Sequence, residues 1–399
     1  MASGFSFDFL PTTAANESST AVETTQAVEQ TRRPFAWLAN TAQLLHERSE
    51  QEIVYRDINV HHVSYNDDDV DDDVDDDVND PSRRTTQLRQ VDWKLSSFVS
   101  ATDADAPQEQ QEALWQQTDL SPGKYEGGMK VWECSLDLVR YLATQQEADL
   151  MSITGGQVLE LGCGHGLPAC FMLQQAIRKQ QQEPEPDDNS SSSNKNKQKK
   201  PPPLLTVMYV DYNDFVLKDV TVSNIVINAA AADIAIEDVV PHVLLGAGDW
   251  LELSKQLLLL QAQSQSKQLD PTIAAATAAV IKEEEESTPI PATTMAQLPT
   301  DGKLDCILAA ETIYSDQAAR DTATFCVRHV RLTTGVAWIA TKRYYFGVGG
   351  GSEAFRQGVK TAAASQDVTA VVETVQVYDN GTSNIRELLR VQCFPRADE

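Results

Sequence analysis

The sequence of 399 residues lacks any apolar run long enough to span a membrane, and it has no Lys or Arg before Arg32. An N-terminus that carries Asp8 and Glu17 but no basic residue is unlike a signal or transit peptide. The six cysteines include no C-x-x-C pair, which argues against a zinc site or a disulfide framework and favours a reducing compartment. We therefore expect a protein of the cytoplasm and nucleus that holds no metal and contacts no membrane.

Basic residues are also scarce, with 32 Lys and Arg against 59 Asp and Glu, so the formal net charge is −27. This charge argues against a general surface for polyanions, and we expect a basic protein partner rather than sequence-specific binding of nucleic acid.

Ten aspartates lie within residues 67–80, with Val at every fourth position. We interpret this tract as a solvated linker. Calcium binding is the alternative, although the tract has neither the glycine nor the final glutamate of an EF-hand loop.

Composition divides the chain into two parts. Residues 1–120 are predicted to be a largely flexible extension, with a short edge strand or docking peptide at FSFDFL (5–10), an amphipathic segment at 35–45 and a possible strand at 53–55. Residues 121–399 are expected to form the folded domain, as a monomer. Two low-complexity inserts interrupt it, at about 179–203 and about 255–301. The bounds of the second are open, because residues 257–260 could extend a helix.

A predicted buried strand at residues 158–161 ends in the alternating glycines Gly162, Gly164 and Gly166, and an apolar helix at 167–177 follows. Residues without side chains let the backbone turn tightly and approach a ligand, which the amide end of the helix would face. The dinucleotide-binding pattern G-x-G-x-x-G would need a glycine at position 167, where this chain has Leu. A glycine-rich turn without a ligand is the alternative.

Asp211 ends the next predicted strand, at residues 205–210. It follows Gly164 by 47 positions, or by about 22 once the insert is left out, close to the spacing of about 20 expected for a ribose-binding carboxylate. Its carboxylate would accept the ribose hydroxyls, with help from the Asn213 amide. The alternative is an N-cap for a helix that begins near Phe215.

Asp249 and Trp250 follow a predicted strand at 242–245. The Asp249 carboxylate would accept from the amino group of an adenine, and the Trp250 ring would pack on it. The alternative is that Asp249 is only a turn residue.

The order of the predicted elements indicates the fold. Strands at 158–161, 205–210, 242–245, 304–309 and 336–341 alternate with helices, and an antiparallel hairpin of residues 371–378 and 388–394 closes the chain. This order predicts an α/β fold with a doubly wound, mostly parallel, seven-stranded Rossmann-like sheet and an antiparallel C-terminal hairpin strand.

These motifs resemble those of the class I S-adenosylmethionine-dependent methyltransferases. Within that superfamily, residues 121–399 resemble the protein-histidine methyltransferases that modify a large-subunit ribosomal protein. The resemblance runs through PGKYEGG (122–128), VWEC (131–134), LELGCG (159–164), DYN (211–213), GDW (248–250) and ETIY (311–314). The narrowest motif is YYFGVGGG (344–351), and FSFDF (5–9) looks like the aromatic start of family members.

The resemblance implies S-adenosylmethionine as the cofactor and methylation of the tele nitrogen of a histidine. By position, it implies cofactor contacts from Val131, Trp132, Glu133, Cys134, Ser135, Gly162, Gly164, Val210, Asp211, Tyr212, Asn213, Gly248, Asp249, Trp250 and Ala310. Trp132 and Glu133 would lie near the methionine amino group of the cofactor. The alternative for this pair is an aromatic core anchor beside a first-turn carboxylate that the helix dipole favours.

A neutral imidazole is already nucleophilic at pH 7, so the enzyme needs an acceptor for the N–H of the non-reacting ring nitrogen rather than a strong base. Glu311 and Tyr314 are our candidates for that side of the site, and a capped helix start with a packed ring is the alternative. Tyr345, Phe346, Gly347 and Gly349 are predicted to form the substrate wall, unless their loop makes no substrate contact. His165 is interpreted as a bystander.

Two other functions stay open. A lysine methyltransferase of the same superfamily would have to deprotonate an ammonium with a pKa near 10.4, so its activity should rise steeply with pH. A ribosome-assembly factor that binds the cofactor without turnover is the other alternative. The intact glycines, Asp211 and Asp249 argue against an inactive pocket.

Overall fold

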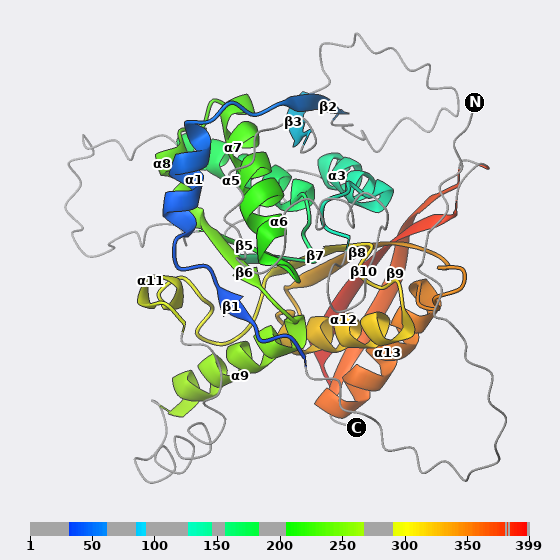
Figure 1. The fold of residues 1–399 in the computed structure, drawn as a ribbon. Helices are drawn as coiled ribbons and strands as arrows, with labels where there is room; N and C mark the ends of the chain where they lie inside the picture. The colour runs from blue at the N-terminus through cyan, green and yellow to red at the C-terminus, as the bar shows by residue number, and fades with distance from the viewer. Residues whose placement is uncertain are drawn as a thin grey trace, which may run out of the picture.

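The computed structural model describes residues 32–61, 85–92, 127–145, 156–182, 205–266, 290–379, 381 and 384–396. The FSFDFL segment, the aspartate tract, residues 121–126 and the central parts of both inserts lie outside these ranges. Within the described ranges, the main sheet has eight strands in the order β1-β6-β5-β4-β7-β8-β10-β9 (Figure 1). Their bounds are β1 Ala36–Trp37, β4 Gln157–Leu161, β5 Thr206–Asp211, β6 Val243–Ala247, β7 Cys306–Ala310, β8 Val336–Lys342, β9 Val368–Tyr378 and β10 Arg386–Pro395.

The five central strands, β4 to β8, are parallel, and β10 and β9 continue the sheet as an antiparallel hairpin. The predicted α/β class and C-terminal hairpin are therefore confirmed. The predicted number of seven strands is one short, because β1 pairs antiparallel with β6 at the other edge of the sheet. A two-residue strand carries no period-2 pattern of its own, so only its pairing with β6 makes it visible.

Helices cover both faces of the sheet (Figure 1). On one face, α3 (Glu133–Thr144), α5 (Leu167–Gln182) and α7 (Val222–Ala231) pack on strand residues such as Val207 and Tyr209. On the other, α9 (Trp250–Ser266), α12 (Asp316–His329) and α13 (Ser352–Gln366) pack on residues such as Met208 and Val210. Successive residues of β5 thus enter opposite core layers, as a strand buried on both faces requires.

Part of the predicted flexible extension is instead folded onto the domain. Besides β1, it supplies α1 (Thr41–Ser49) and a two-stranded sheet of β2 (Tyr55–His61) and β3 (Thr85–Val91). Two asparagines of α7 hold β3: the Asn224 side chain accepts the Val91 N–H at 2.8 Å, and the Asn228 side chain bonds both the N–H and the carbonyl of Arg89 at 2.7 Å. The prediction missed this contact because it depends on amide side chains more than 130 residues away in the chain.

The predicted inserts also begin later than expected. Helix α5 continues to Gln182, and α9 continues to Ser266, so residues 255–266 extend a helix, as the apolar 257–260 segment allowed. A short helix, α11 (Ala292–Met295), lies within the second predicted insert. The remaining short elements are α6 (Asp214–Val216), a π-helical turn (Leu217–Thr221), α8 (Ile236–Val239) and a 3-10 turn (Val240–His242).

Among the helices of the described ranges, none alone has the length and apolar composition to cross a membrane, while the bent pair Asp214–Ala231 and Ile236–His242 meets that test together. All six cysteines are free and buried.

Candidate active site

The glycine loop between β4 and α5 has the backbone that its sequence predicts. Gly162, Gly164 and Gly166 have φ values of +56°, +49° and +65°, in the left-handed region that favours glycine. A Cβ at Gly164 would lie 3.0 Å from the Gly128 carbonyl oxygen, and one at Gly166 would lie 2.9 Å from the Tyr209 ring. Gly166 is therefore needed for packing of the helix start, whereas Gly162 and Gly164 let Thr312 and the Gly128 backbone approach the loop closely.

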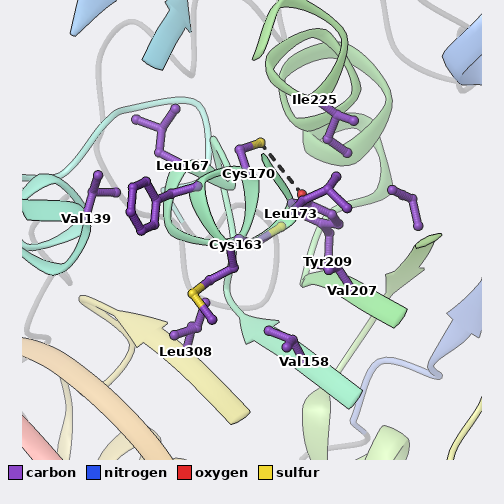
Figure 2. Close-up of a cluster of buried hydrophobic side chains, with 14 of the residues drawn as sticks. Val139, Val158, Cys163, Leu167, Cys170, Leu173, Val207, Tyr209, Ile225 and Leu308 are labelled. Carbon is purple, nitrogen blue, oxygen red and sulfur yellow. Dashed lines mark hydrogen bonds between the residues drawn. The ribbon is translucent and has the colours of Figure 1, made fainter. Parts of the chain in front are cut away.

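The loop rests on a buried apolar cluster. Figure 2 shows Cys163 and Cys170 beside strand residues that include Tyr209, whose hydroxyl donates to the Cys170 Sγ at 3.7 Å, while Leu167 lies on the side of Val139. Beneath the loop, the buried Glu160 carboxylate accepts the Ala169 N–H of α5 at 2.9 Å. Burial raises the pKa of Glu160 to about 8, because the charged form loses its hydration.

Asp211 connects the loop to the end of β5. Its Oδ2 accepts the Gly164 N–H at 2.9 Å, and its Oδ1 accepts the Asn213 N–H at 3.0 Å. The following helix begins at Asp214 with Asn213 at the N-cap position, so Asp211 is not the cap of that helix. Because a carboxylate oxygen can accept more than one hydrogen bond, these two amide bonds do not conflict with the predicted ribose contact.

Asp249 and Trp250 follow β6 at the same edge of the sheet, where the ends of parallel strands gather. The Asp249 Oδ1 accepts the Leu251 N–H at 2.8 Å, so this residue does act as a turn and helix-cap residue. Its Oδ2 lies 3.0 Å from Arg32 Nη1. The Trp250 Cζ3 lies 3.6 Å from the place a Cβ at Gly162 would occupy, so its indole flanks the glycine loop.

Residues 127–135 approach the loop from the other side. A Cβ at Gly128 would lie 2.7 Å from Val216 Cγ1 and 3.2 Å from Asp211 Oδ2, so glycine allows this segment to cross the site. The Trp132 Nε1–H donates to the Gly127 carbonyl at 3.1 Å. Val131, Trp132 and Ser135 are half-buried.

Glu133 and Cys134 begin α3 in different surroundings, and their cofactor contacts stay predictions. The Glu133 carboxylate is 3.4 Å from Arg386 Nη1 and is partly exposed, so an ion pair holds it at the first turn of α3. The Cys134 side chain is fully buried, and burial together with the charge of Glu311 raises the pKa of its thiol. Cys134 thus faces Glu311 rather than the open side of the site.

Glu311 is the centre of a buried polar cluster directly after β7. Its backbone has a φ of +60°, which is rare for a residue with a side chain. The Tyr345 hydroxyl donates to its Oε2 at 2.5 Å, and Lys342 Nζ lies 3.5 Å from its Oε1. This Oε1 is buried and has no hydrogen-bond partner in the described part of the chain, and neither has the neighbouring Thr312 Oγ1.

The cluster adjoins the glycine loop, because Thr312 Cγ2 would lie 3.0 Å from a Cβ at Gly162. The helix-cap alternative for Glu311 is wrong: α12 begins at Asp316, and the Ser315 side chain caps it by accepting the Ala318 N–H at 3.1 Å. Tyr314 is half-buried between them. Its role stays a prediction.

Tyr345 corrects the predicted substrate wall. It is 4% exposed, and burial followed by the charge of Glu311 raises the pKa of its hydroxyl well above the usual range, so it remains a donor. Phe346, by contrast, is 77% exposed, and a Cβ at Gly347 would meet no atom within 4 Å. Phe346 and Gly347 therefore keep the exposure a substrate wall requires, whereas Tyr345 acts inside the cluster.

Gly349 and the two glycines after it lie against the segment that carries Tyr314. The φ of Gly349 is +82°, and a Cβ there would lie 3.0 Å from the Asp316 carboxylate. The Gly350 N–H donates to the same carboxylate at 2.9 Å, and the Gly351 N–H donates to the Ile313 carbonyl at 2.8 Å. The loop therefore packs directly beside the end of β7.

His165 has a structural role, as predicted. Its Nδ1 accepts from the Asn224 side-chain amide at 3.0 Å, and its Nε2–H donates to the Met129 carbonyl at 3.1 Å. Burial lowers its pKa to about 4, so the ring is neutral near pH 7.

Sequence reasoning missed Lys342 and the two arginines before β1. Lys342 Nζ lies 5.3 Å from the centre of the Trp132 ring and 5.6 Å from that of Tyr345. The sequence signal that could have identified Lys342 is a lysine at the end of an otherwise apolar strand.

A separate open groove of about 470 Å³ lies between α13 and β9, at the edge of the sheet, and contains none of the predicted site residues.

No protein-family model matches the chain. Histidine protein methyltransferase 1 homologues are similar to it: the Dictyostelium discoideum protein at 28% identity over 280 residues, covering 70% of this chain and 62% of that protein, and the Bos taurus protein at 26%, covering 66% and 55%. The chain thus spans little more than half the length of these curated relatives. Histidine protein methyltransferase 1 of Saccharomyces cerevisiae is 34% identical over 112 residues, 28% of this chain and 24% of that protein.

Among solved structures, a putative class I S-adenosylmethionine-dependent methyltransferase from Listeria monocytogenes aligns with a TM-score of 0.33 and 9% identity, covering 73% of this chain and 68% of that one. The assignment of the fold rests on the strand order and the glycine loop described above. These relatives support the resemblance to protein-histidine methyltransferases that the motifs indicate: this chain is similar to histidine protein methyltransferase 1 homologues over about two thirds of its length.

Proposed function

We propose that this protein is an S-adenosylmethionine-dependent protein-histidine N-methyltransferase that modifies the tele nitrogen of a histidine in a large-subunit ribosomal protein. The observation that carries the proposal is the buried Oε1 of Glu311, an acceptor without a hydrogen bond that lies next to the glycine loop. The Lys342 ammonium lies 3.5 Å from this oxygen but donates no hydrogen bond to it. A buried acceptor without a hydrogen bond costs free energy, so its retention at this place supports a ligand donor.

The residues present fit the proposed cofactor. Gly162 and Gly164 place no side chain on the loop, where a Cβ would narrow the cradle, and Trp250 offers an aromatic face beside them. Asp211 and Asp249 supply carboxylates at the ends of β5 and β6. S-adenosylmethionine, when bound, supplies an electrophilic methyl group.

The chain's own residues position the histidine that accepts the methyl group. Glu311 Oε1 would accept the N–H of the non-reacting ring nitrogen, which selects the tautomer whose other nitrogen has a free lone pair. The negative charge would also offset the positive charge that develops on the ring. Tyr345 donates to the other oxygen, Oε2, and Lys342 Nζ lies 3.5 Å from Oε1, so the carboxylate is aligned before substrate arrives.

The substrate proposal is supported by charge. A net charge of −27 favours a basic protein partner, and ribosomal proteins are basic. The proposal includes action in the cytoplasm and nucleus, with a free or assembling ribosomal protein as substrate and the enzyme as a monomer. Six free, buried cysteines suit a reducing compartment.

The test is to incubate the full chain with labelled S-adenosylmethionine and ribosomal extract, then hydrolyse the product and identify the methylated amino acid. We expect tele-methylhistidine. Methyl-lysine alone would overturn the proposal in favour of the lysine enzyme, and cofactor binding without any transfer would favour the assembly factor. Glu311→Gln should lose turnover but keep cofactor affinity, and full turnover by that variant would remove Glu311 from the proposal.

A further inference from the structure

The segment of residues 32–38, RRPFAWL, lies along the edge of the sheet beside β6 (Figure 1), and we call it the N-terminal strap. Ala36 pairs with Ala247 and Trp37 with Gly246, and the Leu38 N–H donates to the Leu245 carbonyl at 2.8 Å. Both aromatic side chains of the strap are buried. A Cβ at Gly246 would lie 2.4 Å from Phe35 Cζ, so β6 has a glycine where these rings need room.

The N-terminal end of the strap crosses the loop that follows β6. The Asp249 N–H donates to the Arg33 carbonyl at 3.2 Å. A Cβ at Gly248, whose φ is +132°, would lie 2.3 Å from the Pro34 carbonyl oxygen. Only glycine at position 248 allows the two backbones to come this close.

The two arginines of the strap contact both loops that we expect to hold the adenosine. Arg32 Nη1 lies 3.0 Å from Asp249 Oδ2 and 3.1 Å from Asp321 Oδ2, on α12. Arg33 Nη2 lies 3.4 Å from Asp214 Oδ1, and its guanidinium lies 5.3 Å from the centre of the Tyr212 ring. The strap therefore joins the loop after β5, the loop after β6 and α12.

We infer that the N-terminal strap is the outer wall of the adenosine part of the cofactor site, and that Arg32 is a positioning residue that orients the Asp249 carboxylate. This inference rests on the proposed function. One oxygen of Asp249 is used by the Leu251 N–H, so the other, which Arg32 holds, is the oxygen that can accept from an adenine amino group.

The positive charge of Arg32 also offsets the repulsion between the Asp249 and Asp321 carboxylates, which both contact Arg32 Nη1. Without it, Asp249 and Asp321 would repel each other, and Asp249 would turn away from the adenine position. Removal of Asp321 as well would abolish that repulsion. The pair of variants thus separates positioning from a general loss of structure.

The experiment measures dissociation constants by calorimetry for S-adenosylhomocysteine and for 5′-methylthioadenosine, which has the adenosine but no amino-acid part. We expect Arg32→Ala to weaken both by the same factor, about tenfold, with unchanged stoichiometry. The double variant with Asp321→Ala should recover part of the loss. Arg396→Ala is the matched control, because the Arg396–Asp367 pair lies on an exposed surface remote from these loops.

Wild-type affinity of Arg32→Ala for both ligands would overturn the inference, as would a loss seen only with S-adenosylhomocysteine. A double variant no better than the single one would also contradict the positioning role. A wild-type chain that binds neither ligand would instead overturn the proposed function on which the inference rests. These results are distinguishable because binding is measured without turnover.

Discussion

Replacement of Tyr345 by Phe removes one hydroxyl from the buried cluster and leaves the ring that fills the space. That hydroxyl donates at 2.5 Å to Glu311 Oε2, while Glu311 Oε1 has no hydrogen bond among the residues that the structure describes. The Glu311 carboxylate would then keep Lys342 Nζ, 3.5 Å from Oε1, and the buried Cys134 thiol as neighbours. A hydrogen bond to a charged group contributes about 1.5 to 3 kcal/mol, so we expect the free energy of unfolding to fall by about 2 kcal/mol.

The same change should slow methyl transfer more than it weakens cofactor binding. A carboxylate that is no longer aligned costs about 1.4 to 2.8 kcal/mol at the transition state, which corresponds to a 10- to 100-fold lower rate. The assay is single-turnover transfer of labelled methyl groups to ribosomal extract, together with thermal unfolding and the dissociation constant of the cofactor.

The neighbouring residue provides a matched control. Tyr344 is 57% exposed, so Tyr344→Phe makes the same chemical change outside the cluster and should leave the free energy of unfolding unchanged. If Tyr345→Phe transfers methyl groups at the wild-type rate, the hydroxyl does not align Glu311. Equal destabilisation by both variants would show that the effect does not depend on burial of the hydroxyl.

Three further predictions follow from the described contacts. Glu160 has a pKa of about 8 when folded against 4.5 in the unfolded chain, so the native state keeps a proton that the unfolded state releases. The free energy of unfolding should therefore fall as pH rises between these values, by up to about 1.4 kcal/mol per unit, and Glu160→Gln should flatten the slope. Gly164→Ala should abolish cofactor binding and destabilise by about 2 kcal/mol or more, because backbone strain adds to a 3.0 Å contact. Asn228→Ala should speed amide hydrogen exchange in β3, since two hydrogen bonds to that strand are lost.

Each of these has its own control. If the free energy of unfolding of Glu160→Gln falls between about pH 5 and 8 as steeply as that of the wild type, another group is responsible for the pH dependence. Gly347→Ala has a similar positive φ of +80° but no atom within 4 Å of its Cβ, so it isolates the strain. An equal loss in the free energy of unfolding for both variants would mean that the 3.0 Å contact of the Gly164 Cβ contributes nothing. Unchanged exchange in β3 of Asn228→Ala would show that other contacts suffice to hold the hairpin.

The central sheet was predictable because each strand carries its own signal. In β5, Val207 and Tyr209 enter one core layer while Met208 and Val210 enter the other, and this continuous apolar run is visible without any tertiary information. The position of Asp211 became informative once a polar insert was recognised by composition. The loops at the ends of these strands then had to meet, because parallel strands end at one edge.

The N-terminal contacts were not predictable, because they have no local signal. Strand β1 is two residues long, and β3 is held by the side chains of Asn224 and Asn228. The pair Tyr344 and Tyr345 presents the same difficulty on a smaller scale. Two adjacent tyrosines are alike in sequence, yet the loop backbone exposes one and buries the other against Glu311.

The ion pair between Lys342 and Glu311 bears on which residue is methylated. A lysine acceptor would bring an ammonium group to a carboxylate whose charge Lys342 already offsets, and two cations about 4 Å apart repel by roughly 4 kcal/mol at an effective dielectric constant of 20. A neutral imidazole meets no such repulsion and needs only a hydrogen-bond acceptor, and Glu311 Oε1 receives no hydrogen bond from the described residues. Because Lys342 is 8% exposed and lies near two aromatic rings, solvent does little to screen its charge. The cluster is thus better suited to a neutral acceptor than to a charged one, which favours histidine over lysine.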